Sequence, residues 1–163
     1  MTIKLLPEQQ RFVDDPHPLK LAVSSLRGAG KTTAAIAALR RIVEPGKTYA
    51  VCLLAPEYQV ASLRMIFSEE ISQVVQQQRK ITLSNGARIL WLTPFEWEDR
   101  LRGLDLAGIV LDDVDLYYPS HRQALLYALP CPIKIMTATN RWTYIERASV
   151  TNFGNCEDVQ EWS

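Results

Sequence analysis

The sequence has no net charge, few cysteines and histidines, and no long apolar run. Its 163 residues include 18 lysines and arginines against 18 aspartates and glutamates. A domain that coats nucleic acid is usually basic, so this balance argues against tight, sequence-blind DNA binding and is compatible with a transient grip from a local patch. The 3 cysteines are odd in number and widely spaced, which favours free thiols in a reducing compartment over a disulfide framework.

Two further absences limit the cellular compartment in which the chain can act and the kinds of active site that it can have. Neither a signal peptide nor a run of about 18 apolar residues is present, so we expect a cytoplasmic protein without membrane contact. The 2 histidines have no partners at the spacing of a metal site or a catalytic triad. Hydrophobic residues make up 47% of the chain, which is enough for one core, and we expect a single domain over 1–163.

Apolar runs of strand length alternate with segments of helical period. Strands are predicted at 19–24, 48–55, 108–112 and 133–139, and helices at 32–44, at 57–77 and in "SHRQALLYAL" after Pro119. The segment "KITLSNGARILWLT" predicts a hairpin, because Asn85-Gly86 supplies the positive φ angles of a tight turn. Strands separated by helices predict an α/β fold, a mostly parallel central sheet flanked by helices on both faces, with ligands at the carboxyl ends of the strands.

The stretch "SSLRGAGKTT" at 24–33 lies between a predicted buried strand and a predicted helix, as a phosphate-binding loop does. Ser25 stands where such a loop has its first glycine, which alters the turn but removes no phosphate ligand. A triphosphate needs inward backbone N–H groups, a lysine that reaches the outer phosphates and a hydroxyl on magnesium. A glycine turn that precedes a lysine by chance is the alternative, and the context favours the nucleotide site. The predicted ATP contacts are Gly28, Ala29, Gly30, Lys31, Thr32 and Thr33.

The segment "GIVLDDVD" places carboxylates at the end of a buried strand. In P-loop NTPases such a strand ends in a carboxylate that holds magnesium, and here that residue is Asp112. The next position polarises the attacking water and is Asp113, one methylene shorter than the more usual glutamate. A solvated acidic loop is the alternative, which the phosphate loop upstream disfavours. Asp115 is expected to be a surface or helix-capping residue.

A short helix opened by Pro7 would put Gln9 or Gln10 just ahead of the first core strand. A side-chain amide both donates and accepts hydrogen bonds, which suits the edge of adenine. Gln9 is therefore the predicted adenine contact, and a surface glutamine is the alternative.

From about Leu5 to Asn140 the chain resembles the ATPase domain of the large terminase subunit of tailed phages, the motor that pumps DNA into capsids. The resemblance is carried, in order, by Gln9, "LRGAGKTT", "AVCLLAP", "ITLSNGARILWL", "RLRG" before "LAGIVLDD", and "TAT". Many terminases have a deviant loop of the form R-x-x-G-K-T, which "RGAGKT" matches. The resemblance implies a P-loop NTPase fold of the RecA-like (ASCE) type that helicases also have, with ATP and Mg²⁺ as cofactors.

The resemblance also implies roles for the binding residues and a set of partners. Lys31 and Thr32 would bind the β- and γ-phosphates and Mg²⁺, and Asp112 would complete the metal site. The partners implied are double-stranded DNA, bound transiently, a portal-like or nuclease partner, and copies of this chain in a homo-oligomeric ring. A phage-encoded chain would act in the host cytoplasm, as a monomer when isolated.

Catalysis and coupling are assigned by the same resemblance. Asp113 stands at the catalytic position, and Arg27 matches the loop arginine that senses or stabilises the γ-phosphate. Thr137 and Thr139 match the coupling motif that links hydrolysis to movement. Among the candidates for an arginine finger in a neighbour's site, Arg100, Arg102, Arg141 and Arg147, the best is Arg102, since it precedes a glycine near the magnesium strand. Solvated surface arginine is the alternative for each.

Three departures from the family pattern matter. Because aspartate is one methylene shorter than the usual glutamate, the carboxylate of Asp113 lies about 1.5 Å, roughly one C–C bond, closer to the backbone. This difference predicts slow hydrolysis. The segment "TATNRW" lacks the Pro-Gly that often follows this motif, and the chain has no room for the family's nuclease domain. Two other functions stay open: a helicase-like ATPase module that acts on RNA, and an NTP-binding switch or assembly factor that hardly hydrolyses.

Overall fold

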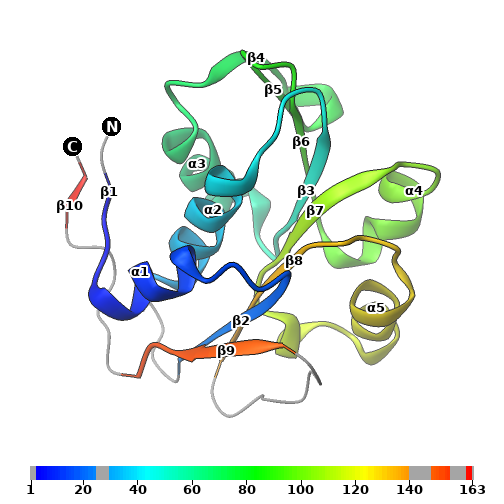
Figure 1. Ribbon diagram of the computed structural model, residues 1–163. Coiled ribbons are helices and arrows are strands. Elements are labelled where there is room, and N and C mark those ends of the chain that lie inside the picture. The colour runs from blue at the N-terminus through cyan, green and yellow to red at the C-terminus, as the bar shows by residue number, and fades with distance from the viewer. Residues whose placement is uncertain (1–2, 25–29, 140–147, 155–160, 163) are drawn as a thin grey trace.

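The computed structural model describes residues 3–24, 30–139, 148–154 and 161–162 (Figure 1). The helices are α1 (Pro7–Asp14), α2 (Lys31–Ile42), α3 (Pro56–Ile66), α4 (Trp97–Leu101) and α5 (Pro119–Gln123). The strands are β1 (Ile3–Lys4), β2 (Leu19–Ser24), β3 (Thr48–Cys52), β4 (Ile71–Val75), β5 (Lys80–Leu83), β6 (Arg88–Leu92), β7 (Leu106–Leu111), β8 (Lys134–Thr139), β9 (Ser149–Asn152) and β10 (Glu161–Trp162).

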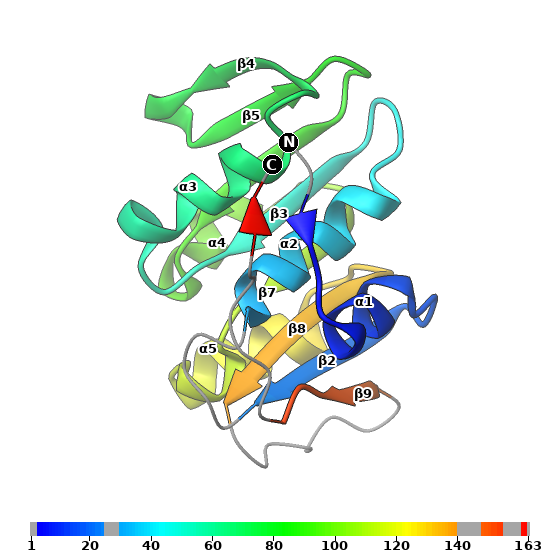
Figure 2. The same ribbon diagram turned by 90° about the vertical axis from the view of Figure 1, so that its left-hand side faces the viewer.

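An 8-stranded sheet, in the order β4-β5-β6-β3-β7-β8-β2-β9, forms the centre of the molecule. All pairs from β6 to β9 are parallel, whereas β4 and β5 add an antiparallel extension at one edge. Helices α1, α2 and α3 cover one face, and α4 and α5 cover the other (Figures 1 and 2). The α/β fold class predicted from the sequence is therefore confirmed.

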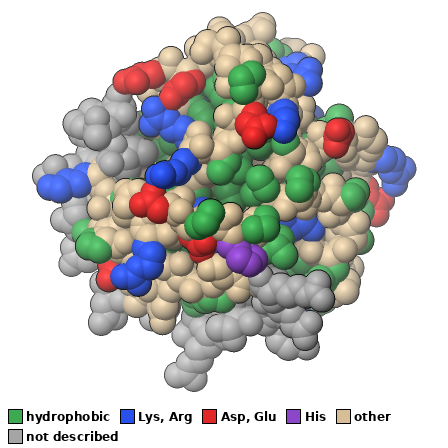
Figure 3. All heavy atoms as spheres, in the orientation of Figure 1, with side chains coloured by type: hydrophobic (Ala, Val, Ile, Leu, Met, Phe, Trp, Pro, Cys, Tyr) green, Lys and Arg blue, Asp and Glu red, His purple; other side chains and the backbone are tan. Residues whose placement is uncertain are grey.

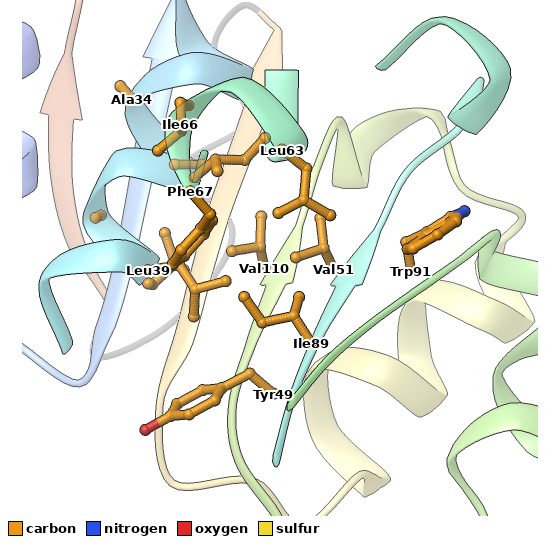
Figure 4. Packing of buried hydrophobic residues seen from close by; sticks show 14 of the residues in the cluster. Ala34, Leu39, Tyr49, Val51, Leu63, Ile66, Phe67, Ile89, Trp91 and Val110 are labelled. Atoms are coloured by element: carbon orange, nitrogen blue, oxygen red, sulfur yellow. The ribbon is translucent and has the colours of Figure 1, made fainter. Parts of the chain in front are cut away.

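Side chains of the central strands alternate between two hydrophobic clusters, one on each face. Val51, Val110 and Ile135 pack under α2 and α3, in the cluster that Figure 4 shows from close by. Their neighbours Ile109 and Met136 belong to the cluster on the opposite face. Each side chain of this size contributes about 1.5–3 kcal/mol when fully buried, so the sheet is anchored from both sides.

Helix α2 lies close against the sheet because its inward positions are small. Ala34, Ala35 and Ala38 are fully buried, and Leu39 fills the space between the helix and the strands. The helix begins shortly after the end of β2, so this packing fixes the position of its amino terminus. That position lies where the parallel strands end, which we call the carboxyl edge of the sheet; the amino edge is where these strands begin.

The hairpin prediction is confirmed, and the prediction of one long helix over 57–77 is wrong. Strands β5 and β6 pair antiparallel around a turn in which Gly86 has a φ of 86°, whereas Asn85, contrary to the prediction, does not have a positive φ. Helix α3 ends at Ile66, and the residues after it turn back to form β4 against β5. No proline or glycine marks this break, and a register shift after Ile71 hides the alternation typical of a strand.

The carboxyl-terminal part of the described chain adds strands that the sequence did not predict. β9 pairs parallel to β2, and β1 pairs with β10 in a separate 2-stranded ladder. The predicted helix after Pro119 is present as α5 and continues as one π-helical segment, Ala124–Ala128.

Two buried lysines lie at the amino ends of neighbouring strands and cap helices. The Lys20 ammonium donates to the carbonyl oxygens of Phe12, Val13 and Asp15, at distances of 2.8, 3.2 and 2.9 Å, where α1 ends. Lys134 donates to the carbonyl oxygens of Leu125 and Leu126, both at 2.9 Å, in the π-helical segment. Burial lowers the pKa of both ammonium groups.

The surface charges and the hydropathy of the helices relate to two expectations from composition, namely a balance of charge and no membrane-spanning segment. Acidic and basic side chains alternate around exposed hydrophobic ones on the face in Figure 3. Within the described ranges, no helix has both the length and the hydropathy needed to cross a bilayer.

Cys52 is buried, as its apolar surroundings in the sequence predict, and this burial raises the pKa of its thiol to about 12.

Candidate nucleotide and magnesium site

The predicted site residues converge at the carboxyl edge of the sheet. β2 ends at Ser24 beside Thr139 of β8, and β7 ends at Leu111 beside Met136. Helix α2 begins at Lys31, shortly after β2 (Figure 2). The parallel order of the strands therefore brings Lys31 and Thr32 toward Asp112, although 80 positions separate Thr32 from Asp112 in the sequence.

Asp112 is fully buried and accepts hydrogen bonds on both carboxylate oxygens. Thr137 Oγ1 donates to Oδ1 at 2.6 Å, and Thr32 Oγ1 donates to Oδ2 at 2.8 Å. Gln59 Nε2 also donates to Oδ2, at 3.0 Å. Burial raises the pKa of this carboxyl group, and the two hydroxyl donors act in the opposite direction. Donors from α2, α3 and β8 thus hold one carboxylate at the end of β7.

The amino terminus of α2 has the geometry of an anion site. Gly30 has a φ of 74°, in the left-handed region that glycine adopts without strain, and its carbonyl accepts the first helical bond from Ala34 N. Lys31 is buried, and its ammonium donates to the Ser24 carbonyl oxygen at 3.1 Å. Unpaired N–H groups and the helix dipole favour negative charge at such a terminus. Thr33, also a predicted ATP contact, is buried on the same first turn.

Asp113 has a left-handed backbone, with φ 54° and ψ 51°. Its N–H donates to Thr137 Oγ1 at 2.8 Å, so one threonine hydroxyl contacts both Asp112 and Asp113. Asparagine and aspartate tolerate this conformation better than other side chains. The sequence identified both aspartates but held no sign that Thr137 ties them together.

Asp115 differs from its expected role as a surface or helix-capping residue. Its carboxylate accepts hydrogen bonds from the Thr139 N–H, at 3.1 Å, and from the Thr139 hydroxyl. The two predicted coupling threonines therefore face two different aspartates, which fastens the end of β8 to the segment after β7. These contacts depend on β8 lying next to β7, which the sequence alone does not state.

Gln59 was not predicted as a site residue. It lies on the first turn of α3, after β3, and β3 neighbours β7 in the sheet. Its contact with Asp112 depends on the position of β3 beside β7, which the sequence alone does not state.

Gln9 is buried, and its Oε1 accepts the Leu6 N–H at 2.8 Å, which caps the start of α1. The structure thus gives this side chain a role in the fold, and its contact with adenine stays a prediction. Arg27, Gly28 and Ala29 lie outside the described residues.

The two arginine candidates within the described residues, Arg100 and Arg102, lie away from this cluster. Arg102 pairs with Glu98 on the surface, and the following Gly103 lines a pocket together with Thr48 and Arg88, the first residues of β3 and β6. Arg102 is therefore at the opposite edge of the sheet from Lys31. Arg100 donates to the Gln78 carbonyl oxygen, and Arg141 and Arg147 lie outside the described residues.

The donor set fits a magnesium ion and a phosphate chain. Mg²⁺ binds oxygen ligands and keeps several waters, so one hydroxyl and one carboxylate satisfy its protein share. Thr32 and Asp112 supply those oxygens side by side, and Lys31 brings a buried ammonium to the same helix terminus. In the described part of the chain, histidine, cysteine and carboxylate side chains form no cluster of three or more that would hold another metal.

Comparison with known proteins finds neither a matching family model nor a matching curated protein. Among solved structures, the large terminase of a thermophilic bacteriophage matches with a TM-score of 0.67 and 15% identity, over 93% of this chain and 46% of that one. The complex of the same terminase with ADP matches with a TM-score of 0.64 and 13% identity, over 92% and 45%. The N-terminal domain of the DNA packaging ATPase from bacteriophage phi29 matches with a TM-score of 0.51 and 16% identity, over 85% and 80%.

These likenesses concern the fold, since the identities are low. The chain spans about half the length of the thermophilic phage terminase chains. The resemblance to large terminases noted in the sequence is confirmed at this level. The chain shares its α/β fold with the large terminase of the thermophilic phage and with the phi29 packaging ATPase domain.

Proposed function

We propose that this chain is a magnesium-dependent ATP-binding and ATP-hydrolysing motor domain that couples hydrolysis to translocation of double-stranded viral DNA. The observation that carries the proposal is the contact between Thr32, at the start of α2, and the buried Asp112, at the end of β7. A P-loop NTPase holds its metal between such a hydroxyl and such a carboxylate. Two of the structural neighbours, a terminase bound to ADP and a packaging ATPase, support the same choice.

The binding roles follow from donor chemistry. Lys31 would donate to the outer phosphate oxygens, and the first N–H groups of α2, with those of Gly28 to Gly30, would donate to the inner ones. Thr32 and Asp112 would hold Mg²⁺, which when bound supplies positive charge that neutralises the phosphate oxygens. Gln9 would contact adenine if its amide leaves the cap of α1.

The chemical step would use Asp113 and Arg27. Asp113 would orient the attacking water and accept its proton, and Arg27 would stabilise the charge that develops on the γ-phosphate. The short carboxylate of Asp113 predicts slow turnover, because about 1 Å of misplacement can cost a hundredfold in rate. Thr137 and Thr139 would transmit the change at Asp112 and Asp113 to β8 and from there to bound DNA.

The proposed assembly is a homo-oligomeric ring that engages DNA transiently and docks on a portal-like or nuclease partner. Arg102 would contact the phosphates of a neighbouring copy, because it is exposed at the edge opposite its own Lys31. The single domain over 1–163 would be the motor unit of this assembly.

ATP turnover measured with and without double-stranded DNA tests the proposal. We expect magnesium-dependent turnover that DNA stimulates, that Lys31→Ala abolishes and that Asp113→Glu raises. Lys47→Ala is the matched control, since Lys47 is an exposed lysine paired with Glu44. An undiminished rate in a folded Lys31→Ala variant would overturn the proposal, and stimulation by RNA instead of DNA would favour the helicase-like module.

A second candidate function is an ATP-binding switch that hardly hydrolyses. It is favoured by the position of Asp113, which combines a short side chain with a left-handed backbone whose N–H is tied to Thr137. This function predicts tight ATP binding and negligible turnover by the wild type, with turnover rescued by Asp113→Glu. Rapid unassisted turnover by the wild type would reject it.

A further inference from the structure

The Gln59 amide bridges the start of α3 and the carboxylate of Asp112. Its Oε1 accepts the Ala55 N–H at 2.9 Å, and its Nε2 donates to Asp112 Oδ2 at 3.0 Å. The first bond fixes which end of the amide faces the carboxylate, because a backbone N–H requires an acceptor. Gln59 therefore presents an N–H donor to Asp112, held by its own helix start.

Three donors together define the orientation of the Asp112 carboxylate. Thr137 holds Oδ1, whereas Thr32 and Gln59 share Oδ2. In the proposed function Thr32 also binds Mg²⁺, so its bond to Asp112 would change when a nucleotide binds. Gln59 on α3 and Thr137 on β8 would then keep the plane of the carboxylate fixed.

We propose that Gln59 is a positioning residue that orients Asp112 for magnesium and thereby links α3 to the metal site; this inference rests on the proposed function. Partners of ligating carboxylates set the direction of the lone pairs offered to a metal, and their loss typically lowers metal affinity about 10–100-fold.

The test is a magnesium titration of the affinity for a non-hydrolysable ATP analogue, measured by calorimetry on the whole chain. We expect Gln59→Leu to raise the magnesium concentration needed for half-maximal tightening by about tenfold. Binding of the analogue in EDTA should stay at the wild-type level, because the role of Gln59 is to hold Asp112 and not the phosphates. Gln77→Leu, at an exposed glutamine of the turn before β5, is the matched control.

A second variant removes the donor to Asp112 and keeps the bond to Ala55. Gln59→Glu keeps the acceptor for the Ala55 N–H and the size of the side chain but places a carboxylate where the N–H faced Asp112. Because the two carboxylates repel each other, we expect a lower unfolding midpoint in the absence of ligand and a magnesium dependence that differs from that of the wild type. Wild-type magnesium dependence in either folded Gln59 variant would overturn the positioning role alone. Absence of magnesium-dependent binding by the wild-type chain would instead overturn the proposed function and this inference together.

Discussion

Lysines at the amino and carboxyl ends of the parallel strands are similarly buried but differ in what their ammonium groups contact. Lys20, at the amino edge, has 3% of its surface exposed and donates to three carbonyl oxygens at the end of α1. Lys31, at the carboxyl edge, has 7% exposed and, among the described residues, donates to the Ser24 carbonyl oxygen. An ammonium has three N–H donors, so the described residues use all three donors of Lys20 and one donor of Lys31.

The remaining buried charges extend this comparison. Lys134, at the amino edge, donates hydrogen bonds to carbonyl oxygens of the π-helical segment, as Lys20 does to those at the end of α1. At the carboxyl edge, the donors around Asp112 are hydroxyls and an amide from separate elements, which can exchange partners when a metal arrives. Among the described residues, Asp112 is therefore the buried charge held by side-chain donors, whereas Lys20 and Lys134 donate to backbone carbonyls that already belong to helices.

The largest expected effect is on ATP turnover when Lys31 is replaced. Lys31→Met removes the ammonium from the helix terminus, and we expect turnover to fall by roughly a hundredfold or more, as for other lost transition-state donors. The free energy of unfolding should change by less than about 1 kcal/mol, because only one described bond is lost. Steady-state ATPase assays and urea unfolding measure the two quantities.

Lys20→Met should reverse that pattern. The substitution leaves three carbonyl oxygens at the end of α1 without the hydrogen-bond donor that Lys20 provides. We therefore expect the free energy of unfolding to fall by about 2–4 kcal/mol. Nucleotide affinity of the folded protein should stay within about twofold of the wild type, a change of less than about 0.5 kcal/mol. A variant as stable as the wild type, or one that loses nucleotide binding while folded, would remove the distinction between the two edges.

Thr137→Val tests whether the polar cluster at the carboxyl edge also stabilises the fold. The substitution keeps the shape but leaves Asp112 Oδ1 and the Asp113 N–H without this partner. We expect a loss of about 1–3 kcal/mol in the free energy of unfolding, measured by urea unfolding, with Thr82→Val on β5 as the control. An unchanged stability would mean that water replaces the hydroxyl.

The smallest expected effect concerns the ion pair of Glu96 with Arg79, which lies outside the Asp112 cluster. Arg79 binds both carboxylate oxygens and lowers the pKa of Glu96 to about 2 from an ordinary value of 4.5. Because the folded pKa is the lower one, this stabilisation is complete above pH 4.5 and is lost as the pH falls toward 2. We expect Glu96→Gln to cost about 1–2 kcal/mol at pH 7 and much less near pH 2.

Urea unfolding of both proteins at several pH values measures this difference. Glu98→Gln is the control, since its pair with Arg102 is exposed and should contribute at most about 1 kcal/mol. A Glu96→Gln effect that does not depend on pH would show that the packing of the side chain matters more than its charge.

Local patterns predicted those parts of the molecule in which sequence neighbours decide the structure. The apolar runs indicated the parallel strands, Asn85-Gly86 indicated the hairpin, and the loop before Lys31 and the end of β7 indicated the candidate site. The strand nature of 71–75 was not predictable in this way, because pairing with β5 overrides a helix-like spacing. The contacts of Asp112 with Gln59 and of Thr139 with Asp115 depend on strand order, which a single sequence does not state.

The most direct test of a magnesium–nucleotide site at the carboxyl edge is the affinity for a non-hydrolysable ATP analogue, with magnesium and with EDTA, in the wild type and in Asp112→Asn. We predict one binding site per chain, tightened by magnesium in the wild type, and a tightening lost in the folded Asp112→Asn variant. Equal tightening by magnesium in both proteins, or no binding by the wild type, would contradict the assignment of this site.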